Sequence, residues 1–187
     1  MAKKWGLPYR QKESFDICFI AGKDHNEFLK KYLKLRPGKI ISKTPPHPSP
    51  YQGEGWGGVL GQHQGSSLYT IGQKAQVGGP GPYYVVGFNR KKNVLFVTNK
   101  PNDSQLYKKT LIAEKVNWIL GQEPKFPLKC LARIRYGHQA VPAKILRSRT
   151  SEDFLVEFKM PQRAITPGQS VVFYGKKGEV LGGGIIL

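Results

Sequence analysis

The sequence contains little cysteine, few acidic residues and no long apolar run. Its two cysteines, Cys18 and Cys130, are too few for a disulfide framework and neither belongs to a CxxC pair, so we expect a reducing, cytoplasmic setting. No apolar run approaches the ~20 residues needed to span a bilayer. The first residues, Met-Ala-Lys-Lys-Trp, lack the apolar core of a signal peptide. We therefore expect no membrane partner.

The histidines are few and scattered: His25, His47, His63 and His138. They lack the spacing of metal ligands, so we predict no metal. His63 invites a catalytic interpretation, but no partner lies near it in the sequence. We therefore interpret it as a structural hydrogen-bonding residue beside a turn.

Basic residues greatly outnumber acidic ones. Thirty Lys and Arg against 12 Asp and Glu give a formal net charge of +18, enough to attract a polyanion at long range. Residues 1–43 carry eleven basic and four acidic side chains, residues 44–87 one of each, and residues 88–187 eighteen and seven. Two basic ends thus flank a neutral middle. Nucleic acid is the favoured partner, and a basic surface that only keeps the protein soluble stays open as the alternative.

The 187 residues suffice for one domain or two small ones. A helix is expected over residues 24–33, where Asp24 and Glu27 form a capping-box arrangement and apolar residues recur on one face. Pro37-Gly38 ends it, and a strand begins directly afterwards. Residues 44–58 are rich in proline and glycine and predict an inserted surface loop, with a polyproline docking segment as the alternative.

The next patterns are those of a hairpin and of a helix. Tyr83–Gly87 and Asn93–Thr98 are two β-rich runs around a basic turn, which predicts a hairpin. Residues 106–120 include a helical pattern, with Leu111, Ile112 and Val116 among its apolar candidates.

From Phe126 onward, short strands and turns alternate, which predicts a small β-barrel. The expected strands are Leu128–Tyr136, Val141–Arg147, Phe154–Phe158, Ser170–Tyr174 and one that opens at Glu179–Leu181. In the first of these, Arg133 and Arg135 share a face, whereas Cys130 is expected in the core. Gly182–Gly184 suits a tight barrel corner or a close approach of backbones.

Residues 160–186 are the most specific part of the chain. They resemble the C-terminal signature of the tRNA-specific 2-thiouridylases, P-Q-R-A-V-T-P-G-Q-S-V-V-F-Y followed by L-G-G-G-I-I, and Ile165 is the one departure in the first run. The family's F-L-x-x-Y-L-x-x-x-P-G-K-I pattern recurs at 28–40, and its L-G-x-H-x-G and Y-T-I-G-Q patterns recur at 60–65 and 69–73.

The resemblance implies a role for Cys18. Family members carry D-S-x-G-I-C-F-I where this chain has residues 13–20, and that cysteine receives the persulfide sulfur. Glu13 replaces the family's aspartate and Asp16 its glycine. A persulfide forms from a thiolate, so a nearby cation such as Lys12 or Lys23 would lower the thiol pKa. From the residues alone, an inert buried cysteine is the open alternative.

The resemblance also implies three tRNA-binding residues: Arg135, Tyr136 and Gln169. Arg135 can pair with phosphate, Tyr136 can stack on a base or sugar, and Gln169, in a Pro-Gly-Gln turn, can hydrogen-bond RNA. The open alternative is that Tyr136 only packs and Gln169 only caps its turn.

The complete family enzyme uses ATP to activate the wobble uridine, U34, before sulfur transfer. Its Ser-Gly-Gly-x-Asp-Ser phosphate loop and its first catalytic cysteine have no counterpart in this sequence. We therefore expect no cofactor in this chain and no thiolation by the chain alone. The expected partners are tRNA, a sulfur-donor protein (desulfurase or relay) and, in a split enzyme, a separate ATP-binding half.

These patterns and the resemblance together predict a mostly β chain with short helices: a small α+β central domain followed by a C-terminal β-barrel of the elongation-factor type. The expected divisions are 1–22, a remnant of the ATP-binding domain with the Cys18 loop; 23–80, the central domain; and 81–187, with the barrel from about 126. Two functional hypotheses stay open. The chain is either a fragment of a thiouridylase, from a split or truncated gene, or a stand-alone basic RNA-binding module without catalysis.

Overall fold

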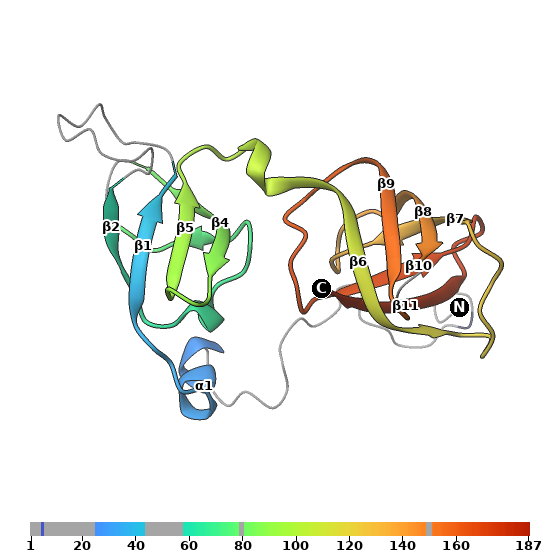
Figure 1. Ribbon diagram of the computed structural model, residues 1–187, viewed down its shortest axis with the longest axis horizontal. Helices are drawn as coiled ribbons and strands as arrows, with labels where there is room; N and C mark the ends of the chain where they lie inside the picture. The colour runs from blue at the N-terminus through green and yellow to red at the C-terminus, as the bar shows by residue number, and fades with distance from the viewer. Residues whose placement is uncertain (1–4, 6–24, 44–57, 79–80, 149–150) are drawn as a thin grey trace. The chain divides into compact units, whose positions relative to one another are not determined.

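A computed structural model describes residue 5 and residues 25–43, 58–78, 81–148 and 151–187 (Figure 1). The chain divides at Leu35–Arg36 into two units. The helix α1 belongs to the first unit and the strands belong to the second. Short 3-10 helices, η2 (Ser66–Leu68) and η3 (Ser104–Leu106), connect strands in the second unit.

Helix α1 spans His25–Tyr32, as its sequence pattern predicts. Phe28 and Leu29 are half-buried, whereas their charged neighbours Glu27, Lys30 and Lys31 are exposed. The rings of Phe28 and Tyr32 lie 4.8 Å apart, one helical turn from each other. The Leu33 N–H donates to the Leu29 carbonyl (2.9 Å), which closes the last turn before the extended segment that leads to Pro37.

Five of the described strands form one sheet in the order β2-β1-β5-β4-β3. Their bounds are β1 Gly38–Ser42, β2 Val59–His63, β3 Lys74–Ala75, β4 Tyr83–Asn89 and β5 Val94–Thr98. β1 and β5 run parallel, and the other neighbours run antiparallel. The buried core of the sheet comprises Ile40, Ala75, Tyr83, Val85, Leu95 and Val97.

The predicted hairpin after residue 82 is present as β4 and β5. These strands pair from Tyr84–Thr98 to Asn89–Val94, with exposed basic residues at 90–92 in the turn. Because β5 also pairs with β1, the sheet continues across the domain division expected at 80/81.

Six of the described strands close into a barrel in the order β10-β11-β6-β9-β8-β7 (Figure 1). Their bounds are β6 Tyr107–Trp118, β7 Leu128–Arg133, β8 Val141–Arg147, β9 Phe154–Arg163, β10 Ser170–Tyr174 and β11 Val180–Ile186. This confirms the predicted class, mostly β with a barrel toward the C-terminal end.

The core of the barrel is apolar and rich in aromatic rings. Trp118 lies 5.7 Å from both Phe154 and Phe173 and 5.9 Å from Phe126, measured between ring centroids. Such ring pairs add about 0.5–1.5 kcal/mol each beyond area burial. The remaining buried members come from each of the six strands, for example Ala113, Ala132, Ile145, Val156, Val171 and Ile186.

The helix predicted within residues 106–120 is wrong: these residues form β6, the longest strand of the barrel. Leu111 and Ala113 are buried at odd positions, whereas Trp118 is buried at an even one. The phase changes at Lys115, whose φ of 50° lies in the left-handed region. Such a bulge imitates helical spacing in the sequence. The barrel therefore begins at Tyr107 and not at about residue 126.

The three glycines of β11 let its backbone approach its two neighbours closely. A Cβ at Gly183 would lie 2.7 Å from the Val171 carbonyl oxygen of β10. A Cβ at Gly184 would lie 2.7 Å from the Glu114 carbonyl oxygen of β6. Since neither backbone oxygen can move aside cheaply, the predicted close approach of backbones is confirmed at these positions.

Candidate nucleic-acid interface

Strand β7 presents its basic residues on the outside of the barrel. The alternate residues that point inward are buried: Cys130, Ala132 and Ile134. Lys129, Arg133 and Arg135 therefore share the outer face, because side chains along a strand alternate between its two faces. The predicted common face of Arg133 and Arg135 is confirmed.

The three residues expected to contact tRNA come together at one end of the barrel. β7 and β10 are antiparallel neighbours, and Val172 is the partner of Arg133. Continued by two residues, this register places Arg135 opposite Ser170, which directly follows Gln169. Tyr136 follows Arg135. Residues far apart in the sequence thus meet at adjacent strand ends.

Tyr136 and Gln169 both lie in turns with fixed backbones. Tyr136 is 63% exposed, and the turn that holds it closes with a hydrogen bond from the His138 N–H to the Arg135 carbonyl (3.2 Å). The Gln169 N–H donates to the Thr166 carbonyl (3.3 Å), and its own carbonyl accepts from the Ile186 N–H (2.8 Å). These bonds fix the backbone from which an exposed ring and an amide extend at the same barrel end.

Arg133 is a basic residue of this face that the sequence places beside Arg135 but does not assign to tRNA binding. Its guanidinium carbon lies 5.1 Å from the centroid of the Tyr174 ring, an arrangement in which the cation is attracted to the ring face. Its Nε atom is buried and has no hydrogen-bond partner among the described residues. The signal that could have found it is its strand alternation with Arg135.

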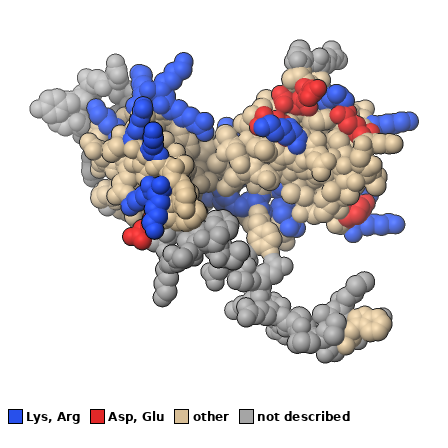
Figure 2. All heavy atoms as spheres, turned by 90° about the horizontal axis from the view of Figure 1, so that it is seen from below, with Lys and Arg blue, Asp and Glu red and all other residues tan. Residues whose placement is uncertain are grey.

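Basic side chains outnumber acidic ones in the chain as a whole. Figure 2 shows lysine and arginine side chains projecting from both the sheet and the barrel, with fewer acidic ones. In the described residues, no three His, Cys, Asp or Glu side chains are placed to hold a metal ion. No helix in the described ranges has the length and apolarity to cross a membrane.

Cys18 lies outside the described residues, as do Lys12 and Lys23. Cys130 is a buried free thiol in the barrel core, as predicted. Burial raises the pKa of Cys130 to about 11. Cys130 therefore carries little thiolate at neutral pH and is poorly suited to sulfur chemistry.

His63 is 1% exposed at the end of β2. Among the described residues neither ring nitrogen has a hydrogen bond of normal geometry, but the Asn93 backbone acts on the ring as a hydrogen-bond partner, so its interpretation as a structural hydrogen-bonding residue stays a prediction. It packs edge-on against Tyr69, with 6.1 Å between ring centroids. Burial lowers the pKa of His63, and the backbone of Asn93 opposes this shift only in part. His63 is thus a buried, uncharged packing residue.

Both the five-stranded sheet and the barrel match known protein families. Residues 26–99 match the tRNA methyl transferase PRC-barrel domain, and residues 108–186 match the aminomethyltransferase β-barrel domain. The chain thus combines these two domain types, and each match covers one of the two β-structures described above.

Whole-chain relatives then identify the family. The chain is 41% identical over 193 residues to tRNA-specific 2-thiouridylase MnmA of Halalkalibacterium halodurans, covering 100% of the chain and 47% of that protein. The same enzyme of Alkalilimnicola ehrlichii is 36% identical (97% of the chain, 48% of that protein), and that of Coxiella burnetii 38% (100% and 48%). The chain belongs to the tRNA-specific 2-thiouridylase family. It spans about half the length of the curated relatives it matches.

Proposed function

We propose that this chain is the tRNA-binding, thiol-bearing part of a tRNA 2-thiouridylase. In this account, the barrel end formed by Arg135, Tyr136 and Gln169 holds tRNA. Cys18 carries the persulfide sulfur destined for the wobble uridine, U34. The observation that supports it best is the convergence of three residues on one end of a basic barrel, although they lie up to 34 positions apart in the sequence. The chain's relatives are named tRNA thiouridylases.

Each residue supplies a different contact to RNA. The guanidinium of Arg135 can bind a phosphate through two parallel hydrogen bonds. The exposed ring of Tyr136 can stack on an unpaired base. The amide of Gln169 can donate to and accept from a base edge or a 2′-hydroxyl. The arrangement suits a single-stranded loop, since only unstacked bases expose their faces.

Sulfur transfer needs a thiolate at Cys18 and an activated uridine. Cys130 is excluded as the carrier, because burial raises the pKa of its thiol to about 11. We assign no residue of this chain to ATP. Its glycine-rich stretch after β3 leads into β4, whereas a phosphate-binding loop leads into a helix N-terminus. ATP activation of the uridine therefore belongs to a part of the enzyme outside these 187 residues.

The tRNA-binding proposal is tested by charge reversal at the barrel end. We expect Arg135→Glu to weaken tRNA binding and to reduce the slope of log affinity against log salt by about one or more. Lys91→Glu is the matched control: it makes the same charge change in the exposed turn between β4 and β5. Wild-type binding by Arg135→Glu at every salt concentration, or an equal loss in the control, would refute the proposal.

The sulfur-carrier proposal is tested by thiol reactivity. Labelling at near-neutral pH, followed by mass mapping, should modify Cys18 rapidly and Cys130 slowly. A Cys18 as inert as Cys130, in a chain that still binds tRNA, would instead favour the stand-alone RNA-binding module. Incubation of the chain with a cysteine desulfurase should further place a persulfide on Cys18 but not on a Cys18→Ser variant.

A further inference from the structure

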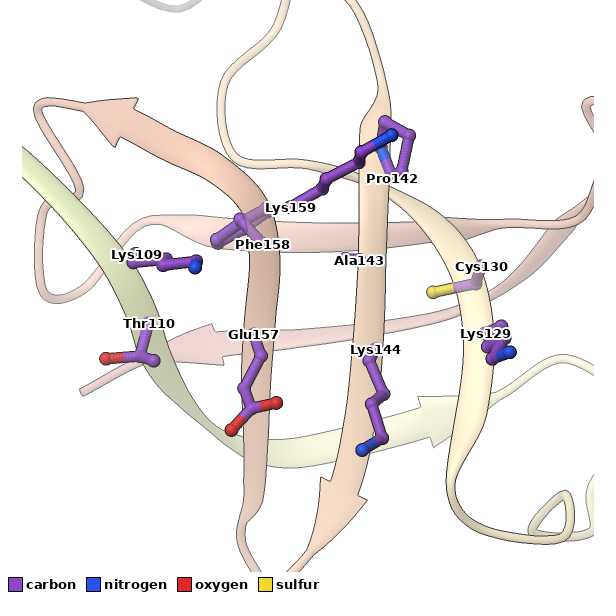
Figure 3. Close-up of a pocket in the computed structure, with 10 residues that line it drawn as sticks. All are labelled: Lys109, Thr110, Lys129, Cys130, Pro142, Ala143, Lys144, Glu157, Phe158 and Lys159. Atoms are coloured by element: carbon purple, nitrogen blue, oxygen red, sulfur yellow. The ribbon is translucent and has the colours of Figure 1, made fainter.

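A groove of about 620 Å³ lies on the barrel where β6, β9, β8 and β7 are neighbours (Figure 3). Four lysines line it, one from each strand: Lys109, Lys159, Lys144 and Lys129. The apolar part of its lining comprises Cys130, Pro142, Ala143 and Phe158. We call this feature the lysine groove. Neither the sequence patterns nor the family resemblance pointed to it.

The groove exists because β9 separates here from both of its neighbours. Pairing of β9 with β8 ends at Phe158, opposite Ala143. Pairing of β9 with β6 is interrupted at Lys109, which lies opposite residues 158–161. A strand bulge of this kind bends the strand and re-aims its side chains. As a result, Lys109 and Lys159 flank a gap that a regular ladder would have closed.

The charge in the groove is mostly uncompensated. Glu157 is the one acidic side chain among the described residues that line it, against four lysines. In the described part of the chain, none of these lysines forms an ion pair with a carboxylate. Lys129, Lys109 and Lys159 are exposed. The lining therefore carries an excess of positive charge, accessible to an anionic ligand.

The chemistry of the lining points to a ligand held by charge alone. A lysine ammonium is a point charge on a flexible stem, suited to phosphates without a fixed orientation. Cys130, the one thiol in the lining, has a pKa of about 11 and carries little thiolate at neutral pH.

The groove lies toward the opposite end of β7 from Arg135 and on the same outer face. Lys129 and Arg135 lie on the same outer face of β7 and its extension. Six residues separate them, about 20 Å of strand at ~3.3 Å per residue. We propose that the lysine groove binds the sugar-phosphate backbone of the tRNA whose loop contacts Arg135, Tyr136 and Gln169. This inference rests on the proposed function and extends its binding surface along β7 and β8.

The test removes charge from the groove without reversing it. Lys129→Gln combined with Lys144→Gln removes two positive charges, and fluorescence anisotropy with labelled tRNA measures affinity across a salt series. Each lost phosphate contact lowers the slope of log affinity against log salt by about 0.7–0.9, so we expect a decrease of about 1.5. The matched control is Lys91→Gln with Lys92→Gln, two exposed lysines of the turn between β4 and β5. It should retain the wild-type slope.

Three results would overturn the inference. The first is a wild-type slope and affinity in the groove variant. The second is an equal loss in the control. The third is binding of a polyglutamate peptide that is as tight as tRNA binding and is lost in the same variant, because the groove would then be an acidic-peptide site. If the first groove variant fails to fold, Lys109→Gln with Lys159→Gln makes the same test from the other two strands.

The outcomes separate this inference from the proposed function. If Arg135→Glu weakens tRNA binding while the groove variant binds tRNA like the wild type, the groove proposal is refuted and the barrel-end site is retained. If the groove variant weakens tRNA binding while Arg135→Glu binds like the wild type, the barrel-end site is refuted and the groove is retained.

Discussion

Lys129 of β7 and Lys144 of β8 are cross-strand partners on the outer face of the barrel. On its other side Lys144 faces Glu157 of β9, which in turn faces Thr110 of β6. Two like charges directly opposite each other destabilise a sheet. The Lys129–Lys144 pair therefore costs stability in the free protein, and an anionic ligand between the two ammonium groups would relieve this repulsion.

Lys129→Glu should stabilise the barrel while it weakens tRNA binding. The substitution turns a like-charge pair into an opposite-charge pair, worth about 0.2–1 kcal/mol in unfolding free energy. Urea unfolding at low salt measures the first effect, and anisotropy with tRNA the second. Lys91→Glu, in the exposed turn between β4 and β5, serves as the control with unchanged stability. A loss of stability in Lys129→Glu would contradict the repulsion.

Tyr136→Ala should separate binding from folding. The ring is 63% exposed, and exposed substitutions usually change stability by no more than about 0.5 kcal/mol. Loss of a base-stacking platform costs about 1–3 kcal/mol in binding. We expect tRNA affinity to fall by about tenfold or more with a nearly unchanged melting temperature. Leu120→Ala, at a residue that is 88% exposed, should change neither quantity.

The sheet should lose stability in mild acid because of His63. Burial lowers the pKa of His63 below the ordinary value near 6.5. Between these two pKa values the unfolded chain binds a proton that the folded chain does not, so stability falls as pH falls. Urea unfolding followed by probes in the sheet, at pH 7.5 and at pH 5, should show this loss.

His63→Gln should reduce that pH dependence even if it lowers stability overall. The matched control is His138→Gln, because His138 is exposed in a turn of the barrel. An unchanged pH dependence in His63→Gln would assign the effect to other groups.

Cys130 should resist alkylation until the barrel unfolds. Its thiol is 8% exposed with a raised pKa of about 11, so thiolate is scarce at neutral pH. Iodoacetamide labelling at pH 7.5, with and without urea, should show a steep rise in Cys130 modification at the unfolding midpoint. Rapid labelling in the absence of urea would mean that the barrel opens locally.

The sequence predicted the barrel strands where alternation was unbroken. Along β7 the alternation of basic and apolar residues gives the inward and outward faces correctly. Gly182–Gly184 likewise pointed to close backbones, because three residues without side chains have little other structural use. Helix α1 followed from its apolar face and its proline-glycine stop.

Other features depend on contacts between distant residues. β6 was mistaken for a helix because the left-handed Lys115 shifts its burial phase. The burial of His63 depends on packing between segments far apart in the sequence, which its sequence neighbours do not show. The lysine groove could not be predicted, since its four lysines come from four strands that only the closed barrel brings together.

The most direct measurement is hydrogen–deuterium exchange of the whole chain with and without tRNA. We expect slower exchange on tRNA binding in three barrel segments: residues 129–137, 142–145 and 168–170. Residues 175–179, in the β10–β11 turn, should exchange at the same rate in both samples. Protection confined to α1 and the five-stranded sheet, with no change in the barrel, would contradict the proposal that the barrel holds the tRNA.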